Sequence, residues 1–392
     1  MHRISSKSLI FLVVFIDLLG FGIMIPMLPF YARSFGASAT EVGFLMFVYS
    51  FMQIFIAPLW GRASDQYGRR PILLITIAGQ CLAFAWAAFA GSYSILLLSR
   101  VFAGGFSANI STASAYMADI SAPEDRAKAM GLVGAAFGLG FVFGPAIGGL
   151  LIPFGYQMPS AFAALLAFIN LVGAFIFLAE PNSSEERRKA NRRRFDWARF
   201  NEILADRKLF LPIFTFSLLT LAFVQLEVTF GLYVLDRFGL SERRAGLLLA
   251  FAGIVMAIVQ GLIVGRASKF FGERRLITTG IILLCLGLFT MGLAPSPWVL
   301  VLALVVLAIG YSFSNPCLSA LVSKSASASE QGSILGIYQS GGSVARVVGP
   351  ILAGTLYDWN LRSPFWAGAL ITLTAVGIWI IFYRKKAGTS EV

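Results

Sequence analysis

Charge, histidine and cysteine are all scarce in this chain. Of its 392 residues, 13% are Asp, Glu, Lys or Arg and 58% are apolar, whereas a soluble domain of this length would carry far more charge on its surface. The single histidine, His2, stands at the terminus, which excludes a histidine metal site and a buried histidine proton relay. The three cysteines, Cys81, Cys285 and Cys317, lie inside apolar runs, so we expect them to pack in cores rather than form disulfides.

Extended polar segments are also lacking, with one exception near the middle of the chain. The other loops are too short to contain a soluble catalytic or ligand-binding domain, and the sequence has no Ser/His, Cys/His or HExxH constellation. These absences argue against an enzyme and against a membrane receptor. They lead us to expect no cofactor and no metal site.

The chain has long apolar runs instead. A bilayer-spanning helix needs about 20 apolar residues, and windows of that length predict twelve transmembrane helices in an all-α membrane protein. The first run is too long for a secretory signal and lacks a cleavage site after it, so we expect it to be retained. The predicted helices are 9–31, 41–61, 71–91, 94–118, 127–153, 160–179, 209–235, 245–265, 274–294, 297–323, 331–357 and 363–383.

The net charge of +12 follows this topology. With the N-terminus in the cytoplasm, 24 Lys and Arg residues fall on the cytoplasmic side, two fall inside the membrane and five fall outside. The five outside are Arg33, Arg237, Arg243, Arg244 and Arg362. This asymmetry is the positive-inside rule, which places both termini in the cytoplasm and explains the basic charge without a nucleic-acid partner.

An internal repeat divides the chain into halves. The segment Gly61 to Pro71, GRASDQYGRRP, returns 204 positions later as GRASKFFGERR, which indicates a duplicated six-helix unit. Between the halves, the segment 181–208 carries nine Lys or Arg residues and is predicted to be a cytoplasmic linker attracted to anionic lipid headgroups. We therefore expect a six-helix bundle over 1–180, the basic linker over 181–208 and a second bundle over 209–392.

Four charged residues fall well inside predicted helices: Asp17, Arg100, Glu227 and Arg346. A charge at bilayer depth costs at least about 2.5 kcal/mol, so each is a candidate functional residue. Asp17 is predicted to load and release a proton, with Arg100 as its partner in coupling; a fixed ion pair of the two that orders the first bundle is the alternative. Glu227 and Arg346 lie at similar depths, so either they form an ion pair or Glu227 binds a cationic substrate.

The helices that carry these charges, the first, fourth, seventh and eleventh, are predicted to face a common polar cavity. The third, sixth, ninth and twelfth carry none and are predicted to face lipid. Other polar residues of the apolar runs should line the same substrate cavity. The predicted cavity residues are Gln53, Asn109, Gln225, Glu227, Asn315, Gln339 and Arg346.

The predicted fifth helix is rich in glycine. Small residues four apart let another helix approach closely, and Pro145 bends the helix. The second half repeats the pattern at Gly349-Pro350 and Gly354, which favours a moving interface, with static packing as the alternative. The predicted hinge residues are Gly140, Gly144, Pro145, Gly148 and Gly149.

The loop after the second predicted helix is the candidate gate. Its residues are Gly61, Asp65, Gly68, Arg69 and Arg70. Asp119 ends the predicted fourth helix in YMADI, near the same cytoplasmic surface. We expect Asp119 to join Asp65 and Arg69 in a conformational latch; simple solvation of a helix end is the alternative.

These motifs resemble those of a known family. Gly61 to Arg70 resembles the loop signature G-x-x-x-D-x-x-G-R-R of the major facilitator superfamily, and Arg100-x-x-x-Gly104 resembles its fourth-helix motif. The run GFVFGPAIGG resembles the fifth-helix motif of antiporters in that family. The run DLLGFGIMIPMLP, which begins at Asp17, is similar to the first helix of twelve-helix drug:proton antiporters, and YMADI is similar to the tetracycline-efflux proteins among them.

The resemblance implies two six-helix bundles that rock about a central site and export a compound against inward proton flow. It implies coupling roles for Asp17 and Arg100, a gate at Asp65, Arg69 and Arg70, and the proton gradient as the source of energy. We therefore expect a monomeric exporter of a small amphipathic or hydrophobic compound in the bacterial cytoplasmic (inner) membrane. Its partners would be that compound, protons and membrane lipids.

Two features depart from the family pattern. Tetracycline exporters carry acidic residues within the third and ninth helices, where this chain has none, which argues against tetracycline as the substrate. Lys269 replaces the loop acid in the second copy of the loop motif, so the gate is not symmetric. An importer, a facilitator, or a lipid or metabolite transporter on the same scaffold is the alternative function.

Overall fold

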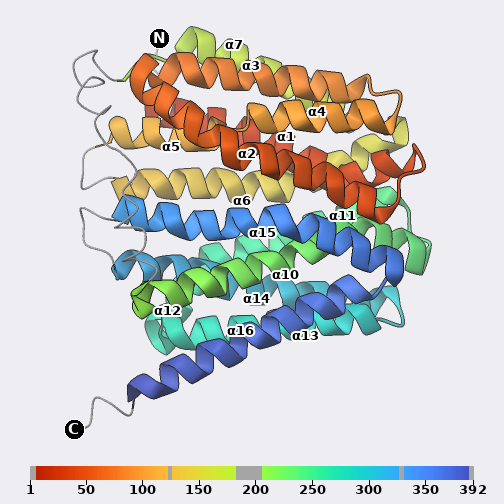
Figure 1. Ribbon diagram of the computed structural model, residues 1–392, viewed down its shortest axis with the longest axis vertical. Helices are drawn as coiled ribbons and strands as arrows, with labels where there is room; N and C mark the ends of the chain where they lie inside the picture. The colour runs from red at the N-terminus through yellow and green to blue at the C-terminus, as the bar shows by residue number, and fades with distance from the viewer. Residues whose placement is uncertain (1–5, 122–125, 182–204, 326–330, 388–392) are drawn as a thin grey trace. The chain divides into compact units, whose positions relative to one another are not determined.

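The computed structural model describes residues 6–121, 126–181, 205–325 and 331–387. All regular elements of these residues are helices, and most are long enough to run side by side within their half (Figure 1). The first half contains α1 (Ser6–Arg33), α2 (Ala39–Tyr67), α3 (Arg69–Ala88), α4 (Tyr93–Gly105), α5 (Asn109–Asp119), α6 (Arg126–Leu151), the short 3-10 helix η2 (Ile152–Phe154) and α7 (Met158–Phe177).

The second half repeats this order. It contains α10 (Arg207–Phe238), α11 (Glu242–Ile258), the π-helical segment η3 (Val259–Val264), α12 (Gly265–Phe271), α13 (Glu273–Leu293), α14 (Pro297–Lys324), α15 (Gln331–Trp359) and α16 (Ser363–Ala387). Of the predicted linker 181–208, residues 182–204 lie outside the described part of the chain.

The twelve predicted apolar runs all correspond to helices. In the described residues, ten helical segments are long and apolar enough to span a membrane, and α6 and α15 account for the remaining two runs. The fourth run was predicted as one helix over 94–118, which is wrong in detail, because the chain leaves the helix at Phe106 and re-enters it at Asn109. Two consecutive glycines, Gly104 and Gly105, directly precede this break and weaken the helix there.

The chain forms two compact units. Each unit consists of one half of the sequence, except that a short segment of each half belongs to the other unit. The first unit comprises Met1–Ala37, Leu45–Arg194 and Ser241–Ala250, and the second comprises Ser38–Phe44, Phe195–Leu240 and Phe251–Val392. The first residues of α2 therefore pack with the second unit, and the first residues of α11 pack with the first unit.

Small residues allow α1 and α6 to touch through their backbones in the first unit. A Cβ atom added at Gly22 of α1 would lie 2.5 Å from the carbonyl oxygen of Gly140 on α6. A Cβ added at Gly144 would collide with the backbone of Gly22. The glycine-rich face predicted from the sequence is thus a tight helix crossing in this structure, where larger side chains have no room.

The repeated loop has the same backbone conformation in both halves. Gly68 precedes α3 with φ +112° and Gly272 precedes α13 with φ +79°, and the two positions are 204 residues apart in the sequence. Residues other than glycine rarely adopt such φ values. The glycine of each copy is therefore required by the turn that joins two long helices.

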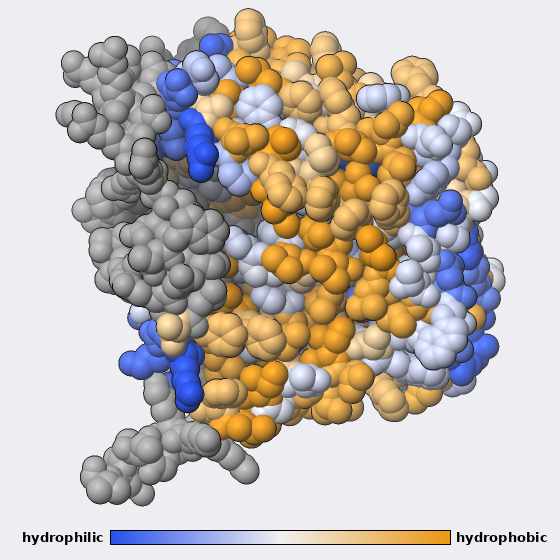
Figure 2. All heavy atoms as spheres, in the orientation of Figure 1, coloured by the Kyte–Doolittle hydropathy of each residue, from blue (hydrophilic) through white to orange (hydrophobic). Residues whose placement is uncertain are grey.

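Large apolar side chains cover the outer faces of α3, α7, α13 and α16, as predicted for the third, sixth, ninth and twelfth helices. Phe168 and Phe175 of α7, Phe289 of α13 and Leu370 of α16 are each at least half exposed. On the face shown in Figure 2, hydrophobic side chains cover the middle of the helices and hydrophilic ones gather toward their ends. This pattern matches a helical surface in contact with lipid.

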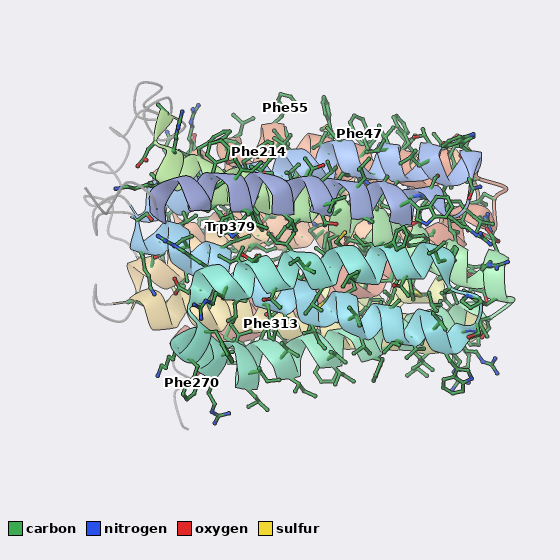
Figure 3. All side chains as sticks on the ribbon, turned by 90° about the horizontal axis from the view of Figure 1, so that it is seen from below. Phe47, Phe55, Phe214, Phe270, Phe313 and Trp379 are labelled. Atoms are coloured by element: carbon green, nitrogen blue, oxygen red, sulfur yellow. The ribbon has the colours of Figure 1, made fainter. Side chains whose placement is uncertain are left out.

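Exposed aromatic residues also occur on helices whose facing was not predicted from the sequence. Figure 3 shows Phe55 of α2 and Phe270 of α12 projecting outward, while Trp379 lies among the helices. Phe55 is 59% exposed and Phe270 is 84% exposed, whereas Trp379 is 1% exposed. On α2, the rings of Phe47, Phe51 and Phe55 follow one another at centroid distances of 5.3 and 4.9 Å, so one stripe of this helix is aromatic.

Candidate functional site

The first unit encloses a polar group around Asp17 of α1. The side-chain amide of Asn109 donates a hydrogen bond from Nδ2 to Oδ1 of Asp17 at 2.6 Å, and Asn109 is almost fully buried. Asn109 is the first residue of α5, directly after the break in the fourth span. The break therefore sets the position of the amide that binds the Asp17 carboxylate.

Arg100 of α4 is close to this group but is not paired with Asp17. Within the described residues the two side chains form no ion pair, so the alternative of a fixed Asp17–Arg100 pair is wrong for this structure. The buried guanidinium lies 5.9 Å above the ring of Phe84, and its Nε and Nη2 atoms have no hydrogen-bond partner in the part of the chain that the structure describes. Arg100 is thus a buried cation with unused donors.

Tyr49 of α2 connects the two charges and was missed from the sequence. Its hydroxyl lies close enough to interact electrostatically with both Asp17 and Arg100, and Gln80 of α3 and Ser107 face it. Two signals in the sequence could have indicated these residues. Tyr49 stands one helical turn before the predicted cavity residue Gln53, and Gln80 is a polar residue within an apolar run.

Gln53 of α2 belongs to the same region of the first unit. Its side-chain amide donates to the backbone oxygen of Ser107 at 3.2 Å. Ser107 lies in the break between α4 and α5, where backbone groups are not used by the helix. Gln53 therefore supports the break that positions Asn109.

The predicted gate residues meet at one end of the first unit. Arg69 forms ion pairs with Asp65 at 2.6 Å and with Asp119 at 2.8 Å, and its Nη1 donates to the hydroxyl of Ser64 at 2.6 Å. Arg69 begins α3, Asp65 belongs to the last turn of α2 and Asp119 ends α5. One guanidinium thus joins three helices, and Asp119, Asp65 and Arg69 meet as the sequence predicted. The loop expected after Gly61 is shorter than predicted, because α2 continues to Tyr67 and α3 begins at Arg69.

Glu180 completes this end and was not predicted. Its two carboxylate oxygens accept hydrogen bonds from the backbone amides of Arg69 and Arg70, each at 2.9 Å. These amides belong to the first turn of α3, which needs external acceptors. The Arg70 side chain donates in turn to the backbone oxygen of Phe175 at 2.8 Å, so the end of α7 holds the start of α3. The sequence places Glu180 directly before the basic segment, which is the only signal for it.

The second unit has its own pair of membrane charges. Glu227 of α10 and Arg346 of α15 attract one another, but among the described residues neither forms an ion pair within 4 Å. Tyr311 of α14 interacts with both. The prediction that the two charges lie near each other is consistent with this arrangement. Of the two alternatives drawn from the sequence, the ion pair is not formed in this structure.

The remaining predicted cavity residues lie in three different environments. Asn315 of α14 lies between two tyrosines, with its amide 3.4 Å from the hydroxyl of Tyr311 and its carbonyl 3.4 Å from the hydroxyl of Tyr338. Gln225 is fully buried and its amide donates to the backbone oxygen of Gly349 at 3.4 Å, so it contributes to the contact of α10 with α15. Gln339 is exposed.

A carboxylate of α15 binds the start of α2 within the second unit. Asp358 accepts hydrogen bonds from the backbone amides of Ala39 and Thr40 at 2.9 and 2.8 Å and from the Thr40 hydroxyl at 2.6 Å. Glycines make the crossing close, since a Cβ at Gly43 would collide with the carbonyl oxygen of Pro350. Asp358 thus caps a helix from a distant part of the sequence.

The first unit has a related crossing between α6 and α11. A Cβ at Gly246 would lie 2.9 Å from the oxygen of Pro145, the counterpart of Pro350 in the repeat. Here the polar contact is the hydroxyl of Tyr156, which donates to the carboxylate of Glu242 at 3.0 Å. Burial and this carboxylate raise the pKa of Tyr156 above its ordinary value, so the hydroxyl keeps its proton and can donate.

The predicted hinge residues lie in these two close crossings of α6. Gly140, Gly144 and Gly148 face α1, and Gly149 faces Gly246 of α11.

Within the described residues, no group of three or more His, Cys, Asp or Glu side chains could hold a metal ion.

Charged residues inside the membrane-spanning helices of two related units, with a network of ion pairs at the end of one, are typical of a polytopic membrane transporter. The comparison with protein families agrees, because the Major Facilitator Superfamily matches residues 10–267 and 258–392. The chain belongs to this superfamily.

Relatives of known activity cover nearly the whole chain. A tetracycline resistance protein, class C, from Escherichia coli is 34% identical over 372 residues, which cover 91% of this chain and 92% of that protein. Multidrug resistance protein 2 from Bacillus subtilis (strain 168) is 27% identical over 394 residues, which cover 98% of this chain and 97% of that protein.

Solved structures support the same fold. The human organic anion transporter MFSD10 (TETRAN) superimposes with a TM-score of 0.74 at 26% identity, covering 95% of this chain and 98% of that one. A bacterial homologue of the human lysosomal transporter Spinster gives a TM-score of 0.81 at 16% identity, covering 97% of both chains, and this likeness concerns the fold alone.

Proposed function

We propose that this protein exports a small amphipathic or hydrophobic compound across the bacterial cytoplasmic membrane in exchange for protons. The observation that carries the proposal is the carboxylate of Asp17 inside a membrane-spanning helix, bound by a neutral amide rather than by a cation. A carboxylate held in this way can exist in either protonation state. The resistance proteins among its relatives support the direction of transport.

Asn109 can serve both protonation states of Asp17. Its Nδ2 donates to the charged carboxylate, and its Oδ1 is buried without a hydrogen-bond partner in the described structure. When Asp17 takes up a proton, the new hydroxyl needs an acceptor, and rotation of the amide would present Oδ1 to it. The pair therefore exchanges one hydrogen bond for another instead of leaving a buried donor unpaired.

Arg100 acts on this exchange through its charge. Its guanidinium is buried near Tyr49, and the tyrosine hydroxyl interacts with both Arg100 and Asp17. Tyr49 is thus placed to relay a change at Asp17 to Arg100. We propose coupling roles for Asp17 and Arg100 on this ground, with Tyr49 and Asn109 as positioning residues.

The transport cycle needs contacts that form and break. In the first unit, Arg69 holds Asp65 and Asp119 together, and Glu180 holds the start of α3. In the second unit, Asp358 holds the start of α2 against α15. We propose that these contacts are gates of alternating access. The proton gradient supplies the energy, and no cofactor takes part. The chain works as a monomer surrounded by lipid and does not change its substrate chemically.

Dye transport in proteoliposomes tests the proposal. We expect the reconstituted wild type to move the fluorescent dye rhodamine B, which carries a cationic ring system and a free carboxylate, against its gradient when a pH gradient is imposed. Transport should stop when the pH gradient is collapsed. Asp17→Asn, which keeps the hydrogen bond to Asn109 but cannot ionise, should lose gradient-driven transport while the protein stays folded. A matched control is Asp206→Asn, since Asp206 caps the start of α10 and belongs to the second unit rather than to the polar group around Asp17.

Two outcomes would contradict the proposal. Gradient-driven transport that persists in Asp17→Asn would exclude Asp17 as the coupling residue. Wild-type transport that follows the dye gradient alone, in either direction and independently of pH, would identify a facilitator on the same scaffold.

A further inference from the structure

Two opposite charges in the second unit have no direct partner. Glu227 of α10 and Arg346 of α15 attract one another across more than the 4 Å of an ion pair, and within the described residues no hydrogen bond satisfies either of them. Both positions belong to long helices, well away from the helix ends. The proposed function assigns no chemistry to this pair.

Their exposure indicates that the two charges face open space. Both side chains are half-buried, and none of their polar atoms belongs to the buried, unpaired atoms of the described structure, unlike Oε1 of the neighbouring Gln225. Unpaired charges in a membrane protein are costly unless they face a water-filled cavity or a ligand. The pair is therefore kept apart at the surface of a cavity rather than within the packed core.

Aromatic rings stand beside these charges. Tyr311, which interacts with both charges, stacks on Phe223 of α10 at a centroid distance of 4.4 Å. Tyr338 of α15 stacks on Phe216 of α10 at 4.0 Å. The amide of Asn315 lies between the two tyrosine hydroxyls. Tyr338 is fully buried, whereas Tyr311 and Asn315 are half-buried, so the exposed surroundings combine one aromatic ring, one amide and two separated charges.

We infer that this cluster, Glu227, Tyr311, Asn315 and Arg346, recognises zwitterionic aromatic compounds. The cationic group of the ligand would bind beside Glu227 and its anionic group beside Arg346, while the ring system would pack against Tyr311, which is half-buried. This inference rests on the proposed function, because it names the class of compound that the exporter takes.

Electrostatics favours a zwitterion over a singly charged compound. A ligand with a cation alone would be attracted by Glu227 but repelled by Arg346, and a ligand with an anion alone would meet the reverse. A zwitterion that spans the gap satisfies both charges at once. The same arrangement rejects either simple ion, which a site with one charge would accept.

A pair of xanthene dyes tests the inference without any substitution. Rhodamine B has a cationic ring system and a free carboxylate, and its methyl ester differs only in having lost the negative charge. We expect the full-length protein in detergent to bind rhodamine B about tenfold tighter than the ester, measured by fluorescence anisotropy. Equal affinity for the two dyes would overturn the inference.

Substitutions then assign each charge. Arg346→Gln should weaken binding of rhodamine B about tenfold and leave the ester unchanged or tighter, so that the preference for the free acid disappears. Glu227→Gln should weaken both dyes, because both carry the cation. Matched controls in the same unit are Arg266→Gln and Glu273→Gln, which remove the same charges on α12 and α13 and should change neither affinity.

The proposed function and this inference can fail separately. If wild-type proteoliposomes move no dye on a pH gradient while the acid-over-ester preference and its loss in Arg346→Gln are observed, the inference stands and the export function fails. If transport is gradient-driven but Arg346→Gln weakens binding of the acid and the ester equally, or Glu227→Gln weakens neither, the export function stands and the charge assignment is wrong. Thermal unfolding of each variant, compared with wild type, separates lost recognition from lost folding.

Discussion

Among single residues, Asn109 shows how a neutral side chain can govern a charged one. It donates to the Asp17 carboxylate at 2.6 Å, while the cation expected from the sequence to be its partner, Arg100, stacks on Phe84 instead. A hydrogen-bond donor stabilises the charged form of a carboxylate less strongly than an ion pair does, so the proton can be taken up and released at accessible pH. The neutral partner therefore suits a residue that must cycle.

The first residue-scale prediction concerns Asn109→Ala. Without Asn109, the charged form of Asp17 loses a charge-assisted hydrogen bond and the protonated form loses a weaker neutral one, a difference of about 1.4 kcal/mol that favours the protonated form. We expect the pH of half-maximal transport to rise by about one unit in proteoliposomes.

Gln53→Ala is the control for this experiment. Gln53 also lies beside the break in the fourth span, but its amide binds the backbone of Ser107 rather than Asp17. Its pH profile should coincide with that of the wild type. An Asn109→Ala profile with lower activity but an unchanged midpoint would show that Asn109 is structural only.

At the scale of helices, the crossings of α6 depend on glycine. Gly144 touches the backbone of Gly22 on α1, and Gly149 approaches Gly246 on α11. One helix thus makes two backbone contacts on different faces, with Pro145 between them. Helices that touch through flat glycine surfaces have no interlocking side chains to resist sliding, which suits a helix that must shift during transport.

The prediction at this scale is Gly144→Leu. The new side chain would force α1 and α6 apart, at a cost of about 1–3 kcal/mol or more, and would block transport. Gly138→Ala is the control, because a Cβ at Gly138 meets nothing within 4 Å. We expect a lower unfolding temperature and no dye transport in Gly144→Leu, and wild-type behaviour in Gly138→Ala. Normal turnover of Gly144→Leu would show that the crossing is not tight during the cycle.

At the scale of the whole molecule, the exchange of segments between the units matters most. The first residues of α2 pack with the second unit, where Asp358 caps them, and the first residues of α11 pack with the first unit, where Tyr156 binds Glu242. The two contacts lie at positions related by the internal repeat, yet their chemistry differs. The duplication therefore preserved the backbone crossings and left the polar contacts free to diverge.

The prediction at this scale is Asp358→Ala. Losing a helix cap that accepts three hydrogen bonds should cost about 1–2 kcal/mol and release the start of α2 from α15 more often. A reporter variant, Ser38→Cys, should then react several times faster with a water-soluble maleimide. Replacing Cys81, Cys285 and Cys317 by serine removes background labelling.

Two comparisons make this labelling experiment decisive. Glu242→Gln, at the other crossing, should leave the labelling rate at residue 38 unchanged. An unchanged rate in Asp358→Ala would show that the glycine contacts alone hold the start of α2.

The sequence determined the architecture and the positions of the membrane charges. Twelve apolar runs, the excess of basic residues on one side and the 204-residue repeat leave few folds to consider, because backbone groups in lipid must be satisfied within helices. For the same reason, Asp17, Arg100, Glu227 and Arg346 stand out without any structure, since a charge inside an apolar run is costly. The gate residues Asp65, Arg69 and Asp119 could also be paired, because each ends or begins a helix near the same surface.

Only the tertiary structure decided which of these groups meet. The side of a helix that a residue occupies changes by 100° per position, so Gln225 packs against α15 although it is two residues from Glu227. The break at residues 106–108, which turns Asn109 toward Asp17, leaves no periodic signal in an apolar run. Glu180 and Asp358 bind backbone amides far away in the sequence, and such contacts depend on helix packing in three dimensions rather than on any local pattern.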